Sequence, residues 1–112
     1  MQYYNAARKR GSDRNGRSFD AATIRAVWNK AAHAPGFDPA YVRLDSCGAW
    51  IEWAKYGDTT PGGNGWEVDH IKPVAAGGGD ELSNLQALQW ENNRHKGDQW
   101  PYWSCYYGSK AA

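Results

Sequence analysis

The sequence has 112 residues, which is the length of one domain or of one domain with tails. Its mean hydropathy is −0.84, and it contains no apolar run approaching the roughly 18 residues that a membrane span needs, so we expect a soluble protein with no membrane partner. The first residues contain no apolar signal core, which predicts a cytoplasmic protein. A delivered or secreted effector is the alternative, because some export routes leave no such signal.

Positive charge gathers in the first third of the chain. Residues 1–36 contain seven Lys or Arg and two Asp, whereas residues 37–112 contain six Lys or Arg and ten Asp or Glu, so the net charges are +5 and −4. Residues 1–18 lack apolar periodicity and predict a basic, flexible arm ahead of a domain at 19–112. This asymmetry suits an enzyme that meets a polyanion at one end and holds a cation at the other. A solvated, disordered tail is the alternative.

The first predicted element is a helix that Ser18 or Asp20 caps and that runs to about His33. Its apolar stripe follows i, i+3, i+4, i+7 spacing and consists of Ile24, Val27, Trp28 and Ala31. Residues 37–44 are predicted as a connector. Residues 49–56 are predicted as a strand, with a helix as the alternative.

The second half predicts two strands and a helix. Residues 66–71 and 85–89 are the strands, and a glycine-containing loop at 74–81 lies between them. A short helix is predicted from residue 90 to about residue 96, and Gly97 stands where a C-terminal cap would.

Two further features concern cysteines and aromatic residues. Cys47 and Cys105 form no Cys-x-x-Cys pair, which argues against a zinc knuckle, and we predict two free thiols rather than a disulfide. The aromatic run at residues 100–107 is predicted to pack as a flap over a small core, with base stacking as the alternative.

The residues with the clearest chemistry end the first predicted strand. Phosphodiester hydrolysis needs an activated water and positive charge beside the developing negative charge. Neighbours on a strand point to opposite sides, so Asp69 and His70 are expected to have different roles. The Asp69 carboxylate suits a divalent cation, and the His70 imidazole suits proton abstraction from water.

The following helix is expected to supply a second metal ligand, for which Asn92, Asn93 and His95 are the candidates. Residues two apart on a helix are separated by about 200°, so Asn93 and His95 cannot both reach one metal. Asn92 and His95, three apart, share a face. The spacing alone leaves the choice open.

In order, the motifs are Asp69-His70, a glycine loop at 77–79, Asn84-Leu85, and Asn93-Arg94-His95-Lys96. Together they resemble the HNH endonuclease family. The resemblance implies a small single-domain α+β fold with a ββα-metal core at about 66–98, here with an N-terminal helix and an aromatic C-terminal tail. It also implies roles for the residues: His70 is the general base that Asn84 orients, and Asp69 and Asn93 hold the metal. Lys96 is then expected near phosphate, and His95 is the second choice of ligand.

One departure from the family pattern concerns zinc. Many members place a Cys-x-x-Cys at the start of this helix, where this chain has Gln89 and Asn92, so we expect no structural zinc. Packing is expected to stabilise the fold instead, through Trp66, Ile71, Leu82, Leu85, Leu88 and Trp90. The oxygen ligands favour one Mg²⁺ or Mn²⁺ ion, whereas ligation by His95 would favour Zn²⁺ or Ni²⁺.

The resemblance therefore predicts a metal-dependent endonuclease that cleaves DNA, double-stranded DNA above all, with little sequence specificity. The residues expected to contact nucleic acid are Arg8, Lys9, Arg10, Arg14, Arg17, Lys72, Arg94 and Lys96. Two alternatives are a non-catalytic nucleic-acid-binding module and a nuclease toxin or effector domain. A larger phage, defence or effector complex is a further candidate partner.

Overall fold

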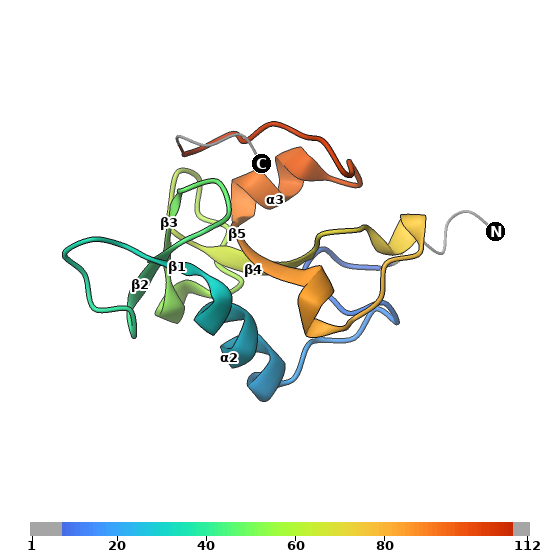
Figure 1. Cartoon of the computed structure of the whole chain (residues 1–112), viewed down its shortest axis with the longest axis horizontal. Helices are drawn as coiled ribbons and strands as arrows, with labels where there is room; N and C mark the ends of the chain where they lie inside the picture. The colour runs from blue at the N-terminus through green and yellow to red at the C-terminus, as the bar shows by residue number, and fades with distance from the viewer. Residues whose placement is uncertain (1–7, 109–112) are drawn as a thin grey trace.

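The computed structural model describes residues 8–108, which form a small α+β fold as predicted (Figure 1). A three-stranded antiparallel sheet has the order β1-β2-β3, and β4 and β5 form a separate antiparallel hairpin. Helices α2 and α3 pack on opposite sides of that hairpin (Figure 1). The element bounds are α2 Ala21–Lys30, β1 Ala32–His33, β2 Val42–Leu44, β3 Trp50–Glu52, β4 Trp66–His70, β5 Leu85–Gln89 and α3 Trp90–Lys96.

Strand β4 is buried on both faces because a helix covers each side of the hairpin. Trp66 and Val68 belong to the apolar core on the α2 side, where Trp28 of α2 packs against Trp66. The alternate residues, Glu67 and Asp69, make their side-chain contacts with α3. The two-residue period of a strand thus gives β4 one apolar face and one acidic face.

The core is centred on aromatic rings. The ring of Trp66 lies 5.2 Å from that of Trp28, 6.0 Å from Trp53 and 4.9 Å from Tyr56, measured between centroids. Rings at such distances add to the stability that burial itself supplies. The indole nitrogen of Trp28 donates to the Pro39 carbonyl at 3.0 Å, so this buried polar group is satisfied.

The predicted core is confirmed in part. Trp66, Leu85 and Leu88 are fully buried, whereas Ile71 and Trp90 are half-buried. Leu82 is 44% exposed, so its place in the core was wrong. It lies in the short 3₁₀ turn 82–84, which follows the surface before β5 begins.

The predicted elements hold with three differences. The prediction of residues 37–44 as a connector was wrong in part, because Val42–Leu44 form β2 and pair with both β1 and β3. Asp20 caps α2 by accepting from the Thr23 amide, but the helix ends at Lys30 because Ala32–His33 pair with β2. Residues 49–56 combine β3 with a 3₁₀ turn, Trp53–Lys55. Within residues 8–108, no helix is both long and apolar enough to cross a membrane.

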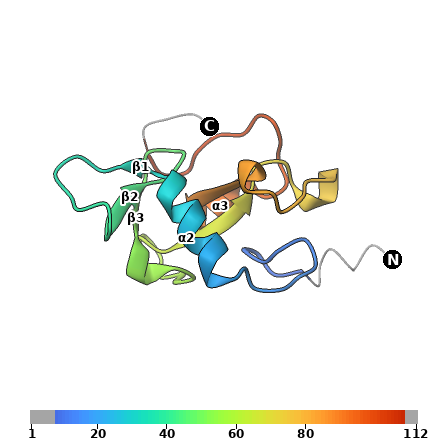
Figure 2. The same cartoon turned by 60° about the horizontal axis from the view of Figure 1, so that its bottom comes forward.

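Residues 8–18 of the predicted arm fold against the domain. Ser12 and Ser18 form a β-bridge, and the Arg14 amide donates to the Asp80 side chain. The Arg10 guanidinium lies 3.9 Å from the Asp98 carboxylate. This segment lies at the same end of the molecule as the loop before β5, as Figures 1 and 2 both show. Residues 1–7 of the arm lie outside the described residues.

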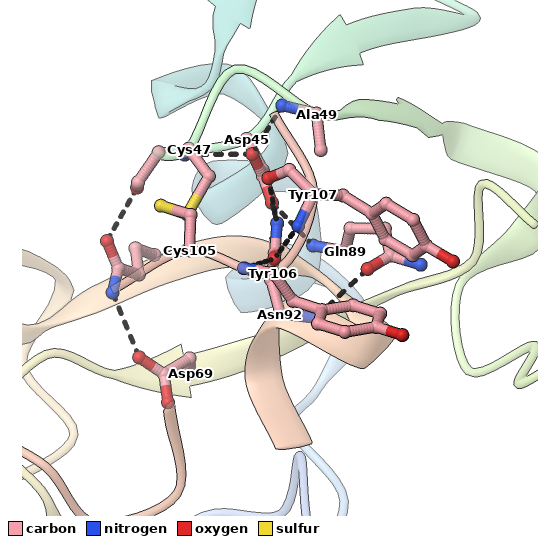
Figure 3. The surroundings of a disulfide bond; sticks show 11 residues. Asp45, Cys47, Ala49, Asp69, Gln89, Asn92, Cys105, Tyr106 and Tyr107 are labelled. Atoms are coloured by element: carbon pink, nitrogen blue, oxygen red, sulfur yellow. Dashed lines mark hydrogen bonds between the residues drawn. A yellow bond between two sulfur atoms is a disulfide. The ribbon is translucent and has the colours of Figure 1, made fainter. Parts of the chain in front are cut away.

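The prediction of two free thiols was wrong, because Cys47 and Cys105 form a disulfide with a Cα–Cα distance of 5.9 Å. The bond ties the C-terminal segment to the turn before β3 (Figure 3). The flap prediction was wrong too, since Trp100, Tyr102 and Tyr106 are 46%, 86% and 59% exposed. The segment runs along α3 instead of covering the core, because the disulfide holds it there (Figure 1).

Candidate active site

Asp69 and His70 face opposite sides of β4, as expected for strand neighbours. The His70 ring packs 5.8 Å from the Phe19 ring, between centroids, and its side chain is only 5% exposed. Its Nε2 atom lies 2.7 Å from Oδ1 of Asp80. A histidine at the end of a buried strand is thereby fixed by one apolar and one acidic neighbour.

The Asp69 carboxylate is buried beneath α3 and has two partners. Lys96 places its Nζ atom 3.3 Å from Oδ2 and 3.4 Å from Oδ1, and Gln86 donates to Oδ2 at 2.9 Å. Burial raises the pKa of Asp69, and the Lys96 charge and the Gln86 hydrogen bond oppose that rise. The carboxylate is therefore held by donors that a bound cation would have to replace.

Lys96 differs from its predicted place near phosphate. Its side chain is 1% exposed, and Nζ also donates to the His70 carbonyl at 2.9 Å. A buried ammonium needs charge and acceptors around it, and Asp69 and this carbonyl supply them. Lys96 is thus a counter-ion within the site and not a surface contact for a polyanion.

The three candidate ligands of α3 have different surroundings. Asn93 is buried against β4 and donates to Glu67 at 2.8 Å. His95 is exposed, and its ring lies 5.8 Å from that of Tyr106. Asn92 is buried too, but its side chain bonds Asp45 and the C-terminal segment. Of the three, Asn93 shares a pocket with Asp69.

Helix α3 presents Asn93 to this pocket because its ends are capped. The Gln89 side chain accepts from the Glu91 and Asn92 amides at 2.9 and 3.0 Å. At the other end, Gly97 has a φ of 55°, and its amide donates to the Asn93 carbonyl at 3.1 Å.

A small pocket brings the separate parts together. Strand β4, α3, the loops that follow them and the arm all contribute to its lining, which is Arg8, Arg10, Gly11, Val68, Asp69, His70, Pro73, Asn93, Gly97 and Asp98. Carboxylate and amide oxygens of Asp69 and Asn93 are hard ligands of the kind Mg²⁺ takes. Among residues 8–108 no three His, Cys, Asp or Glu cluster as a metal cage, so water or phosphate oxygens would have to complete the ligand set. The residues fit one hard divalent ion bound in this way.

Asn84 braces the loop that follows His70. Its Oδ1 atom accepts from the Lys72 amide at 2.8 Å, and its Nδ2 atom donates to the carbonyls of Lys72 at 3.1 Å and Gly79 at 2.9 Å. The Asn84 carbonyl also accepts from the Ile71 amide at 2.8 Å. Its hydrogen bonds thus hold the backbone on both sides of the loop, which places the end of β4.

The predicted basic contacts occupy different places. Arg8 and Arg10 line the pocket itself, whereas Lys9, Arg14 and Arg17 are exposed elsewhere on the arm. Arg8 and Arg10 alone among these side chains bring positive charge to the lining of the pocket.

The two remaining basic candidates have partners of their own. Arg94 donates to Glu67 at 2.9 Å, and the Lys72 amine lies 5.3 Å from the centre of the Trp100 ring. Both stay close enough to the surface to meet a ligand, since Arg94 is exposed and Lys72 half-buried.

Sequence reasoning missed three polar residues of the site. Asp80 contacts His70, Gln86 contacts Asp69, and Glu67 contacts Asn93. Glu67 and Gln86 carry a readable signal, because a strand's period places Glu67 beside Asp69 and the hairpin register pairs Asp69 with Gln86. No sequence pattern predicts the contact of Asp80 with His70, apart from the position of Asp80 after the glycines.

Residues 47–99 match the family model described as HNH endonuclease. The matched segment runs from the first cysteine through β3, β4, β5 and α3, and it contains Asp69, His70, Asn84 and Asn93. The arm at 8–18 lies outside it. Searches of the curated proteins and of the solved structures returned no significant match.

Proposed function

Since residues 47–99 match the model of the HNH endonuclease family, we propose that the chain is a metal-dependent endonuclease that hydrolyses phosphodiester bonds in DNA. The observation that carries this proposal is the shared pocket. Asp69 and His70 of β4, Asn93 of α3, and Arg8 and Arg10 of the arm line one small space. Hydrolysis of a phosphodiester needs a base that activates water and positive charge beside the phosphate. This pocket combines an imidazole, arginine side chains and a carboxylate that can bind a cation.

His70 is proposed as the general base. Its imidazole takes a proton from a water molecule, whose oxygen attacks phosphorus as the bond from phosphorus to the leaving 3′ oxygen breaks. The leaving oxygen then takes a proton from solvent. Arg8 and Arg10 lie where their charges oppose the negative charge that grows on the phosphate.

Asp69 and Asn93 are the residues proposed to hold the cation. A bound divalent ion supplies charge that stabilises the transition state and the leaving oxygen. Mg²⁺ and Mn²⁺ suit these oxygen atoms, and the exposed position of His95 argues against a site built on its imidazole. Binding at Asp69 requires the Lys96 ammonium to give up at least part of its ion pair with this carboxylate.

Cleavage of plasmid DNA tests the proposal. Supercoiled DNA is incubated with wild type, His70→Ala and His33→Ala in EDTA, Mg²⁺, Mn²⁺, Zn²⁺ and Ni²⁺. His33 is an exposed histidine of β1 and serves as the matched control. We expect nicking or linearisation by wild type and by His33→Ala in Mg²⁺ or Mn²⁺, and at least about a 100-fold loss in His70→Ala.

Two results would contradict the proposal. Equal cleavage by His70→Ala would remove the proposed base. Binding of DNA without cleavage in any metal would favour the non-catalytic binding module, and a repeat with single-stranded DNA and RNA would separate this from a different substrate. A single recurring cut site among many sequences would overturn the expected lack of specificity.

The salt dependence of DNA binding tests the role of the arm. Removing one cation that neutralises a phosphate is expected to lower the slope of log K against log salt by about 1. Arg8→Gln and Arg10→Gln should each do so, measured by fluorescence anisotropy of a labelled duplex. Lys55→Gln is the control, because Lys55 pairs with Glu52 at 3.3 Å and lies outside the pocket. Slopes equal to wild type in both arginine variants would place DNA elsewhere.

One observation favours the effector alternative over a cytoplasmic enzyme. Disulfides persist chiefly in oxidising compartments, and the Cys47–Cys105 bond closes a separation of 58 residues. We propose that the nuclease works outside the reducing cytosol. Expression of the chain in cells with reducing and with oxidising cytosol, scored for growth arrest and for rescue by His70→Ala, tests this; equal arrest in both would contradict it.

A further inference from the structure

Asp80 lies between the His70 ring and the basic arm. Its Oδ1 atom is 2.7 Å from Nε2 of His70 and accepts the Arg14 backbone amide at 3.1 Å, while Oδ2 lies 3.3 Å from the same amide. The His70 side chain is 5% exposed and the Asp80 side chain 32% exposed. The carboxylate is therefore shared between a nearly buried ring and a segment that lines the pocket.

We propose that Asp80 is a positioning residue that fixes the orientation of His70 and decides which ring nitrogen carries its proton. An ionised carboxylate only accepts hydrogen bonds, so the nitrogen that faces it must be the protonated one. Neutral imidazole carries a single proton, and with Nε2–H donating to Asp80, Nδ1 is left as the acceptor. Nδ1 is then the atom that takes the proton from water. The catalytic meaning of this inference rests on the proposed nuclease function, but the state of the ring does not.

The loop that carries Asp80 is held by Asn84. The Asn84 side chain donates to the carbonyl of Gly79, the residue before Asp80, at 2.9 Å. Its other contacts hold Lys72, two residues after His70. Asn84 thus fixes both the strand end that bears His70 and the loop that bears Asp80.

The arm also contacts Oδ1 of Asp80, the oxygen that faces His70, through the backbone amide of Arg14. Asp13 and Gly16 close a turn in which the Gly16 amide donates to the Asp13 carbonyl at 2.9 Å, and Arg14 occupies the second position of that turn. The Arg14 amide is free to point outward from such a turn, and it donates to Asp80. Asp80 therefore links the docking of the arm to the orientation of the His70 ring.

The ring can be observed directly by ¹⁵N NMR of protein labelled at histidine, with no substrate present. The chain has three histidines, and His70→Ala assigns the signal. In wild type at a pH where the ring is neutral, we expect a His70 Nε2–H proton that is protected from exchange with water and an unprotonated Nδ1. Asp80→Ala should lose this protection, and Asp80→Asn should keep it in part because an amide oxygen still accepts.

Glu81→Gln is the matched control, because it removes a neighbouring exposed carboxylate and should leave the His70 signal unchanged. Thermal unfolding shows whether each variant is folded. If Asp80→Ala unfolds, Asp80→Asn and Asp80→Ser give the same comparison. Protonation on Nδ1, a doubly protonated ring in wild type, or protection that survives in Asp80→Ala would overturn the proposal.

Kinetic measurements then distinguish the effect of Asp80 on the orientation of His70 from its effect on the docking of the arm. Asp80→Ala should lower kcat by at least about 10-fold, with a smaller change in KM, because the base loses the group that orients it. Arg14→Pro removes the amide hydrogen at a turn position that accepts proline, and Arg14→Ala removes the side chain alone. Arg14→Pro should raise KM above that of Arg14→Ala while the His70 signal persists.

The two proposals can fail separately. A protected Nε2–H in an inactive protein would overturn the nuclease function and leave Asp80 as a positioning residue. Cleavage by wild type together with an unchanged kcat in Asp80→Ala would overturn the role of Asp80 and leave the nuclease intact.

Discussion

Among the buried carboxylates that contact helix α3, Asp69 and Asp45 lie near its two ends and are held in different ways. Near its C-terminal end, Asp69 faces the ammonium of Lys96 at 3.3 Å. Near its N-terminal end, Asp45 accepts from four N–H groups, those of Cys47, Ala49, Gln89 and Asn92, at 2.8 to 3.0 Å (Figure 3). A charge held by one cation can exchange that cation for another, whereas a charge enclosed by fixed neutral donors cannot.

The Asp45 end stands where many family members are expected to hold zinc. The two positions that could carry zinc-binding cysteines, Gln89 and Asn92, instead donate to one carboxylate, and Asn92 also accepts from the Tyr106 and Tyr107 amides at 2.8 and 2.7 Å. The disulfide joins the same region to the C-terminal segment (Figure 3). The expectation that packing alone stabilises this end was therefore incomplete, because a hydrogen-bond cluster and a covalent bond contribute as well.

The largest effect is expected from removing the cation at the Asp69 end. Lys96→Met keeps the length of the side chain but leaves the Asp69 carboxylate buried without its charged partner, which is expected to cost about 3–5 kcal/mol of unfolding free energy. Urea unfolding measures the loss. Divalent metal should restore part of it, since a cation bound at Asp69 stabilises the folded state alone.

The double variant Asp69→Asn with Lys96→Met is the control. It removes both charges, so most of the stability should return while metal no longer stabilises the protein. A loss below about 1 kcal/mol in Lys96→Met would show that the carboxylate does not depend on this partner.

The next largest effect is expected at the other end, from breaking the disulfide. Replacing both cysteines by serine frees a separation of 58 residues, which is expected to cost about 2–4 kcal/mol of unfolding free energy. Asp69 and His70 make no contact with this bond, so the double serine variant should cleave DNA at the wild-type rate at a temperature where it stays folded. A loss of cleavage by a folded serine variant would show that the two ends of α3 are coupled.

The sequence predicted the element bounds around the candidate site well. Trp90–Lys96 and Leu85–Gln89 match their predictions because strand alternation and the helix-ending Gly97 are local signals. Opposite facing of Asn93 and His95 follows from helix geometry alone.

The partners across the chain were not predictable in the same way. Asp45 and Asn92 are 47 residues apart, and Cys47 and Cys105 are 58 apart, so each contact exists only once the fold is formed. The same holds for the Lys30 amine, which donates to the carbonyls of Leu82 and Leu85. A sequence pattern shows which face of an element is buried, but it does not show which distant polar group completes a buried charge.

The smallest expected effect is a pH dependence at the Asp45 end. Burial raises the pKa of Asp45 above its ordinary 3.8, and the hydrogen bonds from Asn92, Gln89, Ala49 and Cys47 oppose that rise. Between the ordinary and the raised pKa the folded chain binds more protons at this group than the unfolded chain does, so its contribution to stability is complete below 3.8 and is lost as the pH rises through the folded pKa.

Asp45→Asn has no such group, so the difference in unfolding free energy between wild type and Asp45→Asn should shrink as the pH rises from about 4 towards 7. Asp58→Asn, a change at a turn carboxylate whose pKa is lowered by its Thr60 hydrogen bonds, should give a difference that grows with pH instead. Urea unfolding at several pH values measures both, and a wild-type advantage over Asp45→Asn that increases with pH would mean that the four donors, and not burial, dominate this carboxylate.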